Sequence, residues 1–220
     1  MDQRQAGQSY VAQPPGWWDR HVVPRLIGFC CSQPAIMKQR THVVPLAEGR
    51  VLELGCGGGA NLGLYDRNRL ESLSGIDPSP ELLARARATA RQQGLEVDFR
   101  AGMAEALPFD DGGFDSILCT FTLCSVADPA QVLREMRRVL KPGGKVLYLE
   151  HGRAPDAGPA RWQDRVEPVW KRIAGGCHLT RPVTRAFRDS GFAIAGDGEK
   201  YMPKTPRFLG WVEWGEARPA

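Results

Sequence analysis

The sequence lacks any apolar run long enough to cross a membrane. None of its uncharged stretches approaches the roughly 20 residues that span a bilayer. The first fifteen residues are polar and rich in glutamine, unlike a signal peptide. We therefore expect a soluble protein without an integral membrane segment, while peripheral contact with lipid stays open.

The six cysteines form no CxxC pair and no Cys/His array with the spacing of zinc ligands. Nothing in the sequence argues for a metal. Cys119 and Cys124 lie in an apolar stretch, which favours buried free thiols. Free thiols indicate a reducing, cytoplasmic environment rather than a secreted disulfide scaffold.

A strong excess of charge of either sign is also missing. Lysine and arginine number 29 against 25 acidic residues, so the net charge is only +4. Such a mild balance argues against a nucleic-acid partner, which would require a basic stripe. There is no internal repeat or low-complexity linker, and 42% of the residues are hydrophobic. One domain over residues 1–220 is expected.

A glycine-rich stretch is the most informative feature that is present. The apolar run Val51 to Leu54 ends abruptly in Gly55 to Gly59, giving VLELGCGGG. A strand, a glycine turn and a helix start bring the backbone close to a nucleotide-like ligand. Glycine tolerates positive φ and has no Cβ to hold that ligand away. The alternative is an ordinary glycine-rich connection in an α/β domain.

Strand-like and helix-like segments alternate around this turn. Strands are predicted at 51–54, 72–77, 97–101, 114–121 and 145–150, and helices around 62, over 81–93 and over 128–140. For the helix over 81–93, Ser79 is the expected N-cap, Pro80 occupies the first helical position and Gly94 ends the helix. This alternation requires right-handed βαβ units and a parallel sheet. A helix at 182–190 and a hairpin over 192–216 should follow. The predicted class is α/β: a Rossmann-like, doubly wound, mostly parallel sheet with an antiparallel C-terminal edge hairpin.

Two acids indicate which ligand the turn binds. Asp77 ends the second predicted strand about 20 residues after the glycines, where a carboxylate can hold both ribose hydroxyls; the alternative is that it merely caps the next helix. Glu53 lies directly beneath the turn. A carboxylate there would oppose the pyrophosphate of a dinucleotide and would suit the sulfonium and amino group of S-adenosylmethionine (SAM).

The successive motifs VLELGCGGG, GIDPS, GMAEALPFDDGGFDSI and RVLKPGGKVL resemble those of class I SAM-dependent methyltransferases, over about residues 48–150. In this core the chain is similar to the ubiquinone/menaquinone C-methyltransferases. The flanks WWDRHVVPRLIGFCCS, LEHGRAP and RWQDRVEPVWKRIAGGCHLTRPV resemble a small methyltransferase-like group with alkyl thiol S-methyltransferases and phospholipid N-methyltransferases. The chain departs from the animal members, which carry an apolar N-terminal anchor.

The resemblance implies SAM as cofactor, S-adenosylhomocysteine as product, and a set of cofactor-binding residues. Gly55, Cys56, Gly57 and Gly59 would approach the cofactor by their backbone, and Glu53 would support the turn or the amino group. The remaining assignments are Asp77 and Pro78 at the ribose, Met103, Ala104 and Glu105 at the adenine, and Cys119 and Thr120 at the methionine portion. It also implies three parts: an N-terminal lid or helical segment (1–47), a SAM-binding core (48–150), and an acceptor-side insertion with C-terminal strands (151–220).

The methyl acceptor is expected to be a small molecule. Because the nucleophile must arrive deprotonated, a basic neighbour would help a thiol acceptor, and His151 and His178 are the catalytic candidates. Either could equally be a structural histidine, and Cys177 is expected to be a passive thiol. The segment 162–181 is the candidate acceptor wall, or else an ordinary helix over the sheet edge.

Three functions are compatible with the sequence. The first is S-methylation of a small thiol; the second is N-methylation of a phospholipid amine or C-methylation of a quinone-like acceptor. The third is a SAM-binding protein that transfers no methyl group. The oligomeric state is left open.

Overall fold

The computed structural model describes residues 33–220. The polar segment 1–14, the tryptophans at 17 and 18 and the short helices expected near 21–31 lie outside the described residues, as do Cys30 and Cys31.

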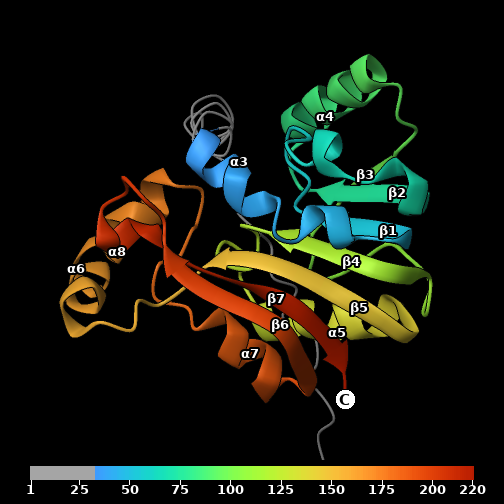
Figure 1. Cartoon of the computed structure of the whole chain (residues 1–220). Helices are drawn as coiled ribbons and strands as arrows, with labels where there is room; N and C mark the ends of the chain where they lie inside the picture. Colours follow the sequence, from blue (N-terminus) through green and yellow to red (C-terminus); the bar gives the residue numbers. More distant parts are fainter. Residues whose placement is uncertain (1–32) are drawn as a thin grey trace, which may run out of the picture.

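Seven strands form one mixed sheet at the centre of the described chain (Figure 1). They are β1 (Gly49–Leu54), β2 (Leu70–Asp77), β3 (Asp98–Ala101), β4 (Phe114–Thr120), β5 (Leu140–His151), β6 (Phe192–Tyr201) and β7 (Trp211–Pro219). Their order is β3-β2-β1-β4-β5-β7-β6. The strands from β1 to β5 pair in parallel, whereas β7 runs antiparallel to both β5 and β6. The predicted fold class, including the antiparallel edge hairpin, is confirmed.

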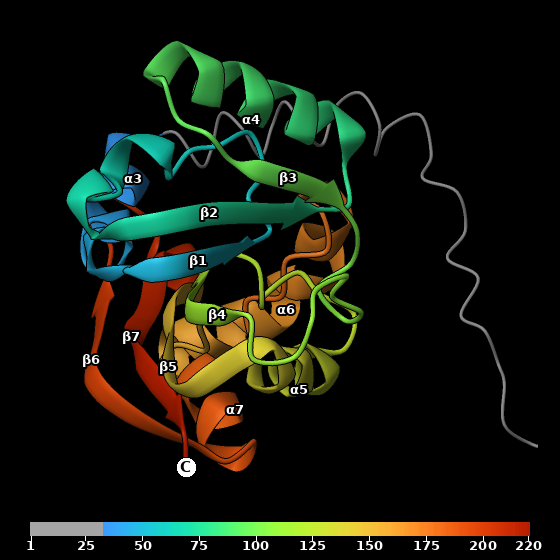
Figure 2. The same ribbon diagram turned by 90° about the vertical axis from the view of Figure 1, so that its right-hand side faces the viewer.

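Helices cover both faces of this sheet. They are α3 (Pro34–Arg40), α4 (Pro80–Gln93), α5 (Pro129–Val139), α6 (Ala157–Ile173), α7 (Val183–Asp189) and α8 (Arg207–Gly210), with 3-10 turns η1 (Val44–Leu46), η2 (Leu62–Leu64) and η3 (Arg67–Arg69). One buried cluster joins the sheet to α5 and α7, and a second joins the opposite face to α4 and η1. In Figure 1, α6 and α8 lie beyond one end of the sheet, and Figure 2 shows α4 and α5 on opposite sides of it.

Local sequence explains why α4 begins and ends where it does. Ser79 is the N-cap, and its hydroxyl accepts a hydrogen bond from the backbone N–H of Leu82, while Pro80 occupies the first turn. Gly94 closes the helix in the left-handed conformation, with φ of 63°. This cap, this proline and this terminal glycine were all predicted from the sequence.

Two elements differ from the prediction. The helix expected around Leu62 is only the 3-10 turn η2, because a second 3-10 turn, η3, and strand β2 follow within a few residues. Strand β5 starts at Leu140, immediately after α5, rather than at Lys145. Among residues 33–220, no helix combines the length and apolar character needed to cross a membrane.

Candidate functional site at the carboxyl edge of the sheet

The carboxyl ends of the parallel strands bring most of the predicted site residues to one edge. Gly55 follows β1, Asp77 ends β2 and His151 ends β5. Since β1 lies between β2 and β4, and β4 lies beside β5, these strand ends are close neighbours. In an open α/β sheet this edge is where ligands bind.

The glycine turn needs glycine for both conformation and space. Gly55, Gly57 and Gly59 have φ values of 62°, 53° and 83°, a region that other residues rarely adopt. A Cβ on Gly55 would come within 2.3 Å of the hydroxyl oxygen of Thr122. The turn is therefore packed against the loop that follows β4. Cys56 contributes its backbone, because its own side chain is buried.

Asp77 anchors the glycine turn and does not cap the helix after it. Its Oδ2 accepts a hydrogen bond of 2.9 Å from the Gly57 N–H, and its Oδ1 accepts one of 2.9 Å from the Ser79 N–H. Each carboxylate oxygen has a further lone pair, so the two oxygens can still accept hydrogen bonds from two hydroxyl groups. Burial raises the pKa of Asp77, while the two N–H groups oppose that rise. Pro78 beside it is largely exposed.

The buried Glu53 carboxylate is bound by side chains that follow the glycine turn. Its Oε1 accepts from the Asn61 side-chain amide at 2.8 Å, and its Oε2 accepts from the Tyr65 hydroxyl at 2.7 Å. Burial raises the pKa of Glu53, opposed by these two donors and by the charge of Arg40. The Arg40 guanidinium in turn donates to Asn61 Oδ1 and to the hydroxyl of Thr120.

Sequence reasoning missed Arg40, Asn61 and Tyr65. The charged Glu53 in an otherwise apolar strand was the signal, because a fully buried carboxylate must find donors nearby.

The predicted adenine residues lie in the loop after β3. Met103 is 50% exposed, whereas Ala104 is buried. Glu105 accepts hydrogen bonds at its Oε1 from the N–H groups of Ala127 and Asp128, at 2.9 and 3.3 Å. Its Oε2 is buried and has no hydrogen-bond partner within residues 33–220. Glu105 Oε2 can therefore still accept a hydrogen bond from a donor such as an exocyclic amine.

Cys119 and Thr120 end β4 and point to opposite faces of the sheet, as successive strand residues must. The Thr120 hydroxyl joins the network of Arg40 and Asn61. The Cys119 thiol instead lies 3.4 Å from Glu150 Oε1 in the core. Only Thr120 thus directs its side chain toward the glycine turn, and the thiol of Cys119 is unsuited to the cofactor contact expected of it.

Phe121 links the cofactor side of this edge to the side near β5. Its ring lies 5.1 Å from the Arg40 guanidinium and 4.9 Å from the His151 ring. Its φ of 54° is unfavourable for an aromatic residue. Such backbone strain costs about 1–3 kcal/mol and is concentrated at functional sites. No sequence pattern indicates this conformation.

Glu150 is a second buried carboxylate that sequence reasoning missed. Its oxygens accept hydrogen bonds from the backbone N–H groups of Thr122, Leu123 and Cys124, at 2.8, 3.0 and 3.2 Å. Burial raises its pKa and these donors oppose the rise. Like Glu53, it is an acid at the end of an apolar strand, so the same signal was present. Glu150 fixes the path of the loop after β4.

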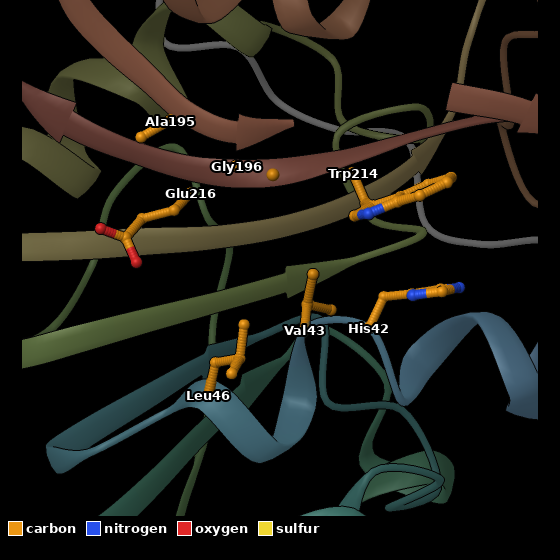
Figure 3. A pocket seen from close by; sticks show the side chains of 8 residues that line it. His42, Val43, Leu46, Ala195, Gly196, Trp214 and Glu216 are labelled. Atoms are coloured by element: carbon orange, nitrogen blue, oxygen red, sulfur yellow. The ribbon is translucent and has the colours of Figure 1, made fainter. Parts of the chain in front are cut away.

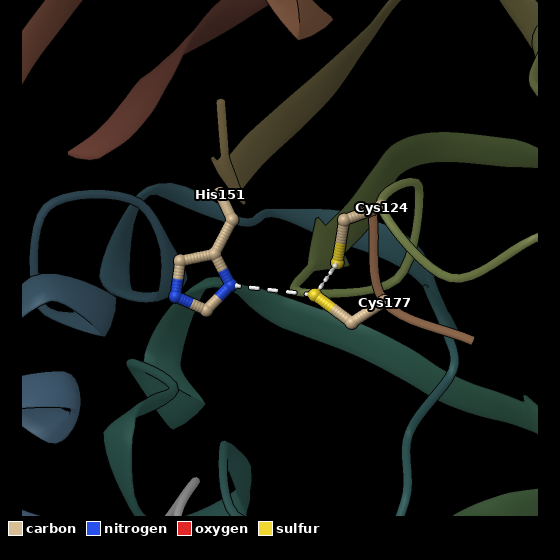
Figure 4. Close-up of side chains that lie close together, drawn as sticks. All are labelled: Cys124, His151 and Cys177. Atoms are coloured by element: carbon tan, nitrogen blue, oxygen red, sulfur yellow. Dashed lines mark hydrogen bonds between the residues drawn. The ribbon is translucent and has the colours of Figure 1, made fainter. Parts of the chain in front are cut away.

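That loop brings Cys124 next to His151 and Cys177 (Figure 4). The Cys177 sulfur lies 3.6 Å from the Cys124 sulfur and 3.9 Å from His151 Nδ1. The pKa of Cys177 is lowered, chiefly by the hydrogen bond from the Cys124 thiol and further by His151 and Trp170. The pKa of Cys124 is raised correspondingly. These neighbours favour deprotonation of Cys177, which was not expected of a passive thiol.

His178 is placed differently from His151. Its Nδ1 lies 2.9 Å from Glu167 Oε1, and the same carboxylate accepts from the Thr180 N–H at 2.8 Å. Its backbone N–H donates to the carbonyl oxygen of Cys124 at 2.7 Å. These contacts give His178 a structural role in holding the segment after α6. Of the two candidate bases, only His151 contacts Cys177.

A hollow of about 160 Å³ lies elsewhere, between η1 and the β6–β7 hairpin (Figure 3). His42, Val43 and Leu46 line one side of it, and Trp214 lies opposite. The rings of His42 and Trp214 stack at 4.6 Å. None of the predicted site residues lines this hollow, so it is separate from the carboxyl edge.

The unpaired polar atoms at the carboxyl edge match polar groups of SAM. Within residues 33–220, Arg40 Nε is a buried donor without a partner and Glu105 Oε2 is a buried acceptor without one. SAM offers a carboxylate to the first and an adenine amine to the second. Its ribose diol matches Asp77, and its sulfonium charge is compatible with the nearby acids.

Comparison with known proteins agrees with this geometry. Residues 52–148 match the family described as "Methyltransferase domain". The thiol S-methyltransferase TMT1B of Rattus norvegicus is 37% identical over 172 residues, which cover 74% of this chain and 70% of the relative. The phosphatidylethanolamine N-methyltransferase of Cereibacter sphaeroides is 42% identical over 113 residues, covering 50% and 54%.

Solved structures show the same fold. A SAM-dependent methyltransferase from Methanosarcina mazei superposes with a TM-score of 0.63 at 24% sequence identity, covering 79% of this chain and 93% of that chain. The sheet order, the glycine turn with Asp77 and the similarity to curated relatives all lead to one conclusion. The chain belongs to the SAM-dependent methyltransferases, and its cofactor is S-adenosylmethionine.

Proposed function

We propose that this methyltransferase transfers the methyl group to the sulfur of a small thiol. The observation that carries the proposal is the 3.9 Å contact between His151 Nδ1 and the Cys177 sulfur at the carboxyl end of β5. The relatives named thiol S-methyltransferases, 37% identical to this chain, support it. An acceptor sulfur reaching this edge would meet surroundings that already stabilise a negatively charged sulfur.

SAM supplies a methyl carbon that the sulfonium has already activated. The chain's own residues must therefore align the acceptor, exclude water and keep the acceptor sulfur deprotonated. His151 is half-buried and packs against Phe121, which also contacts Arg40 on the cofactor side. We assign His151 the task of favouring the thiolate of the acceptor, because the thiolate is the reactive form.

The helix α6 provides an apolar surface near this edge. Trp162, Val169 and Ile173 lie on one face of the helix and are 55%, 60% and 41% exposed. Trp162 also lies near Phe208 of α8, with ring centroids 6.2 Å apart. The expected acceptor wall thus corresponds to α6 and the segment after it, and its apolar face favours a hydrophobic thiol.

The same exposed face supports a second candidate, N-methylation of a phospholipid amine. An apolar stripe flanked by Arg165 and Arg172 has the composition of a surface that meets anionic lipid. The relative named phosphatidylethanolamine N-methyltransferase supports this candidate. The match with this relative covers only half of this chain, however. In addition, an amine acceptor would gain nothing from surroundings that favour a thiolate.

A product screen separates the two candidates. The protein is incubated with labelled SAM and one hydrophobic carbon skeleton carrying a thiol, an amine or a hydroxyl, and in parallel with phosphatidylethanolamine vesicles. We expect the methyl thioether as the main product by mass. Methylated phosphatidylethanolamine without any thioether would contradict thiol methylation and favour the lipid.

The histidine assignment has its own test, with a matched control. His151→Ala should lose most thiol methylation near neutral pH and recover it toward the pKa of a free thiol, about 8.5. His178→Ala should keep the shape of the wild-type pH profile, because its ring is paired with Glu167. If both variants keep the full profile, His151 does not act on the acceptor.

A further inference from the structure

Three metal-binding atoms come together at the carboxyl edge from three separate segments. They are the sulfurs of Cys124 and Cys177 and Nδ1 of His151, and all lie within 4.8 Å of one another (Figure 4). Cys177 lies 26 residues after His151 and 53 after Cys124. This spacing is unlike that of a zinc motif, so only the fold reveals the group.

The distances suit a shared metal better than a disulfide. Around a tetrahedral zinc ion, two thiolates lie about 3.8 Å apart and a thiolate and an imidazole nitrogen about 3.5 Å apart, from bond lengths of about 2.3 and 2.0 Å. The corresponding distances here are 3.6 and 3.9 Å. A disulfide would require the sulfurs to approach to about 2.05 Å.

We propose that Cys124, His151 and Cys177 bind a zinc ion and leave its fourth coordination position open. Two thiolates and one imidazole are ligands that zinc prefers, and three protein ligands with one open position are typical of catalytic rather than structural zinc. Cys124 and Cys177 are both buried, which limits competition from water.

The backbone around each ligand is already fixed. The N–H of Cys124 donates to Glu150 Oε2, and the carbonyl oxygen of Cys124 accepts from the His178 N–H. The N–H of Cys177 donates to the carbonyl oxygen of Ala174 at 3.2 Å, and His151 ends strand β5. Binding would therefore need small side-chain adjustments rather than refolding of a loop.

The charges around the cluster allow an anionic fourth ligand. Zinc with two thiolates and a neutral imidazole carries no net charge, so one more thiolate leaves a single negative charge. The half-buried guanidinium of Arg181 donates to the carbonyl oxygen of Leu123, next to Cys124. The positive charge of Arg181 can compensate for the negative charge that the fourth ligand adds.

The open position fits the acceptor of the proposed function, and this step rests on that proposal. A thiol coordinated there would release its proton to solvent and remain a thiolate at neutral pH. His151 would then favour the acceptor thiolate as a metal ligand rather than as a base. The metal site itself does not depend on the identity of the acceptor.

Metal analysis of the full chain tests the site directly. After exposure to zinc and removal of excess metal, we expect about one zinc ion per chain. Cys124→Ser, Cys177→Ser and His151→Ala should each lower this content at least tenfold. The matched controls Cys119→Ala and His178→Ala should retain it, and SAM binding by each variant reports whether it has folded.

Cobalt gives a second measurement that needs no catalysis. Co²⁺ in the same site should show thiolate charge-transfer absorption, and adding a small thiol should change the spectrum if the fourth position is open. A spectrum that changes without methyl transfer would support the metal site while contradicting the proposed function. Absence of bound zinc or cobalt in folded protein, or a Cys124–Cys177 disulfide found by mass in freshly purified protein, would overturn the inference.

Discussion

Two buried carboxylates, Glu53 and Glu150, organise the two halves of the site in different ways. Each is the second-last residue of a central parallel strand. Glu53 accepts hydrogen bonds from the side chains of Asn61 and Tyr65, on the cofactor side. Glu150 accepts three from the backbone of the loop after β4, on the side of Cys124 and Cys177.

The difference between these partners has a physical consequence. Side-chain donors can rotate and find another acceptor or water, whereas backbone N–H groups can change partner only if the chain itself moves. Glu53 therefore holds side chains around a turn whose path glycine already permits. Glu150 determines the path of its loop, and with it the position of Cys124.

The comparison predicts its largest effect on stability for Glu150→Ala. The substitution leaves three backbone N–H groups without their acceptor inside the protein, so we expect a loss of about 3–5 kcal/mol of unfolding free energy. Glu150→Gln retains one acceptor oxygen and should lose less. Urea unfolding followed by tryptophan fluorescence measures both. An alanine variant within about 1 kcal/mol of wild type would contradict the role of Glu150.

On the cofactor side, the comparison predicts that the ligand is held by Asp77 and only indirectly by Glu53. Asp77→Ala removes the charged acceptor for the ribose hydroxyls and should weaken SAM binding by about 3 kcal/mol, more than a hundredfold. Glu53→Gln should weaken it far less. Calorimetric titration with SAM compares the two variants. If Asp77→Ala binds SAM as tightly as the wild type, Asp77 does not hold the ribose.

Tyr65→Phe tests how much burial adds to a single hydrogen bond. Without the hydroxyl, Glu53 Oε2 loses its 2.7 Å partner in a fully buried site, so we expect a loss of about 2 kcal/mol of unfolding free energy. The matched control is Tyr201→Phe, which removes an equally short bond to the exposed Asp156. That control should change stability by less than about 0.5 kcal/mol. Equal effects would show that burial is not the deciding factor.

Glu48 differs from Glu53 and Glu150 because its carboxylate is half-exposed. Hydrogen bonds from Lys145 and Arg69 lower its pKa to about 2 from the usual 4.5. Because the folded pKa is the lower one, the stabilisation is present above about pH 4.5 and is lost as the pH falls toward 2. Solvent screening limits it to less than about 1 kcal/mol.

Glu48→Gln should therefore lower the melting temperature slightly at pH 7 and have no effect near pH 2. Thermal melting at a series of pH values checks the direction. A larger deficit at acid pH than at neutral pH would contradict the assignment.

Much of the cofactor half was predictable because its signals are local. The strand 51–54, the glycines after it, the cap Ser79 and the acid Asp77 each lie where short-range pattern placed them. Glu53 was recognised from a charge in an apolar run. Glu150, which follows the apolar run 146–149, carries the same signal.

The half of the site around His151 and Cys177 was less predictable because its contacts join distant segments. Phe121 takes a left-handed conformation that no sequence pattern indicated. His151 and His178 were equivalent candidates in the sequence, and only the tertiary contacts of His178 with Glu167 and of His151 with Cys177 distinguish them. Cys177 was expected to be passive because a lowered pKa depends on neighbours from other elements.

The sequence by itself determined the order of strands and helices, the glycine turn, the acid at the end of β2 and the family of SAM-dependent methyltransferases. These features depend on residues within one turn or one strand, where backbone preference and apolar periodicity act directly. Only the tertiary structure decided that Cys124, His151 and Cys177 meet. Their proximity requires β4, β5 and the segment after α6 to end at one edge, which long-range packing of the sheet alone enforces.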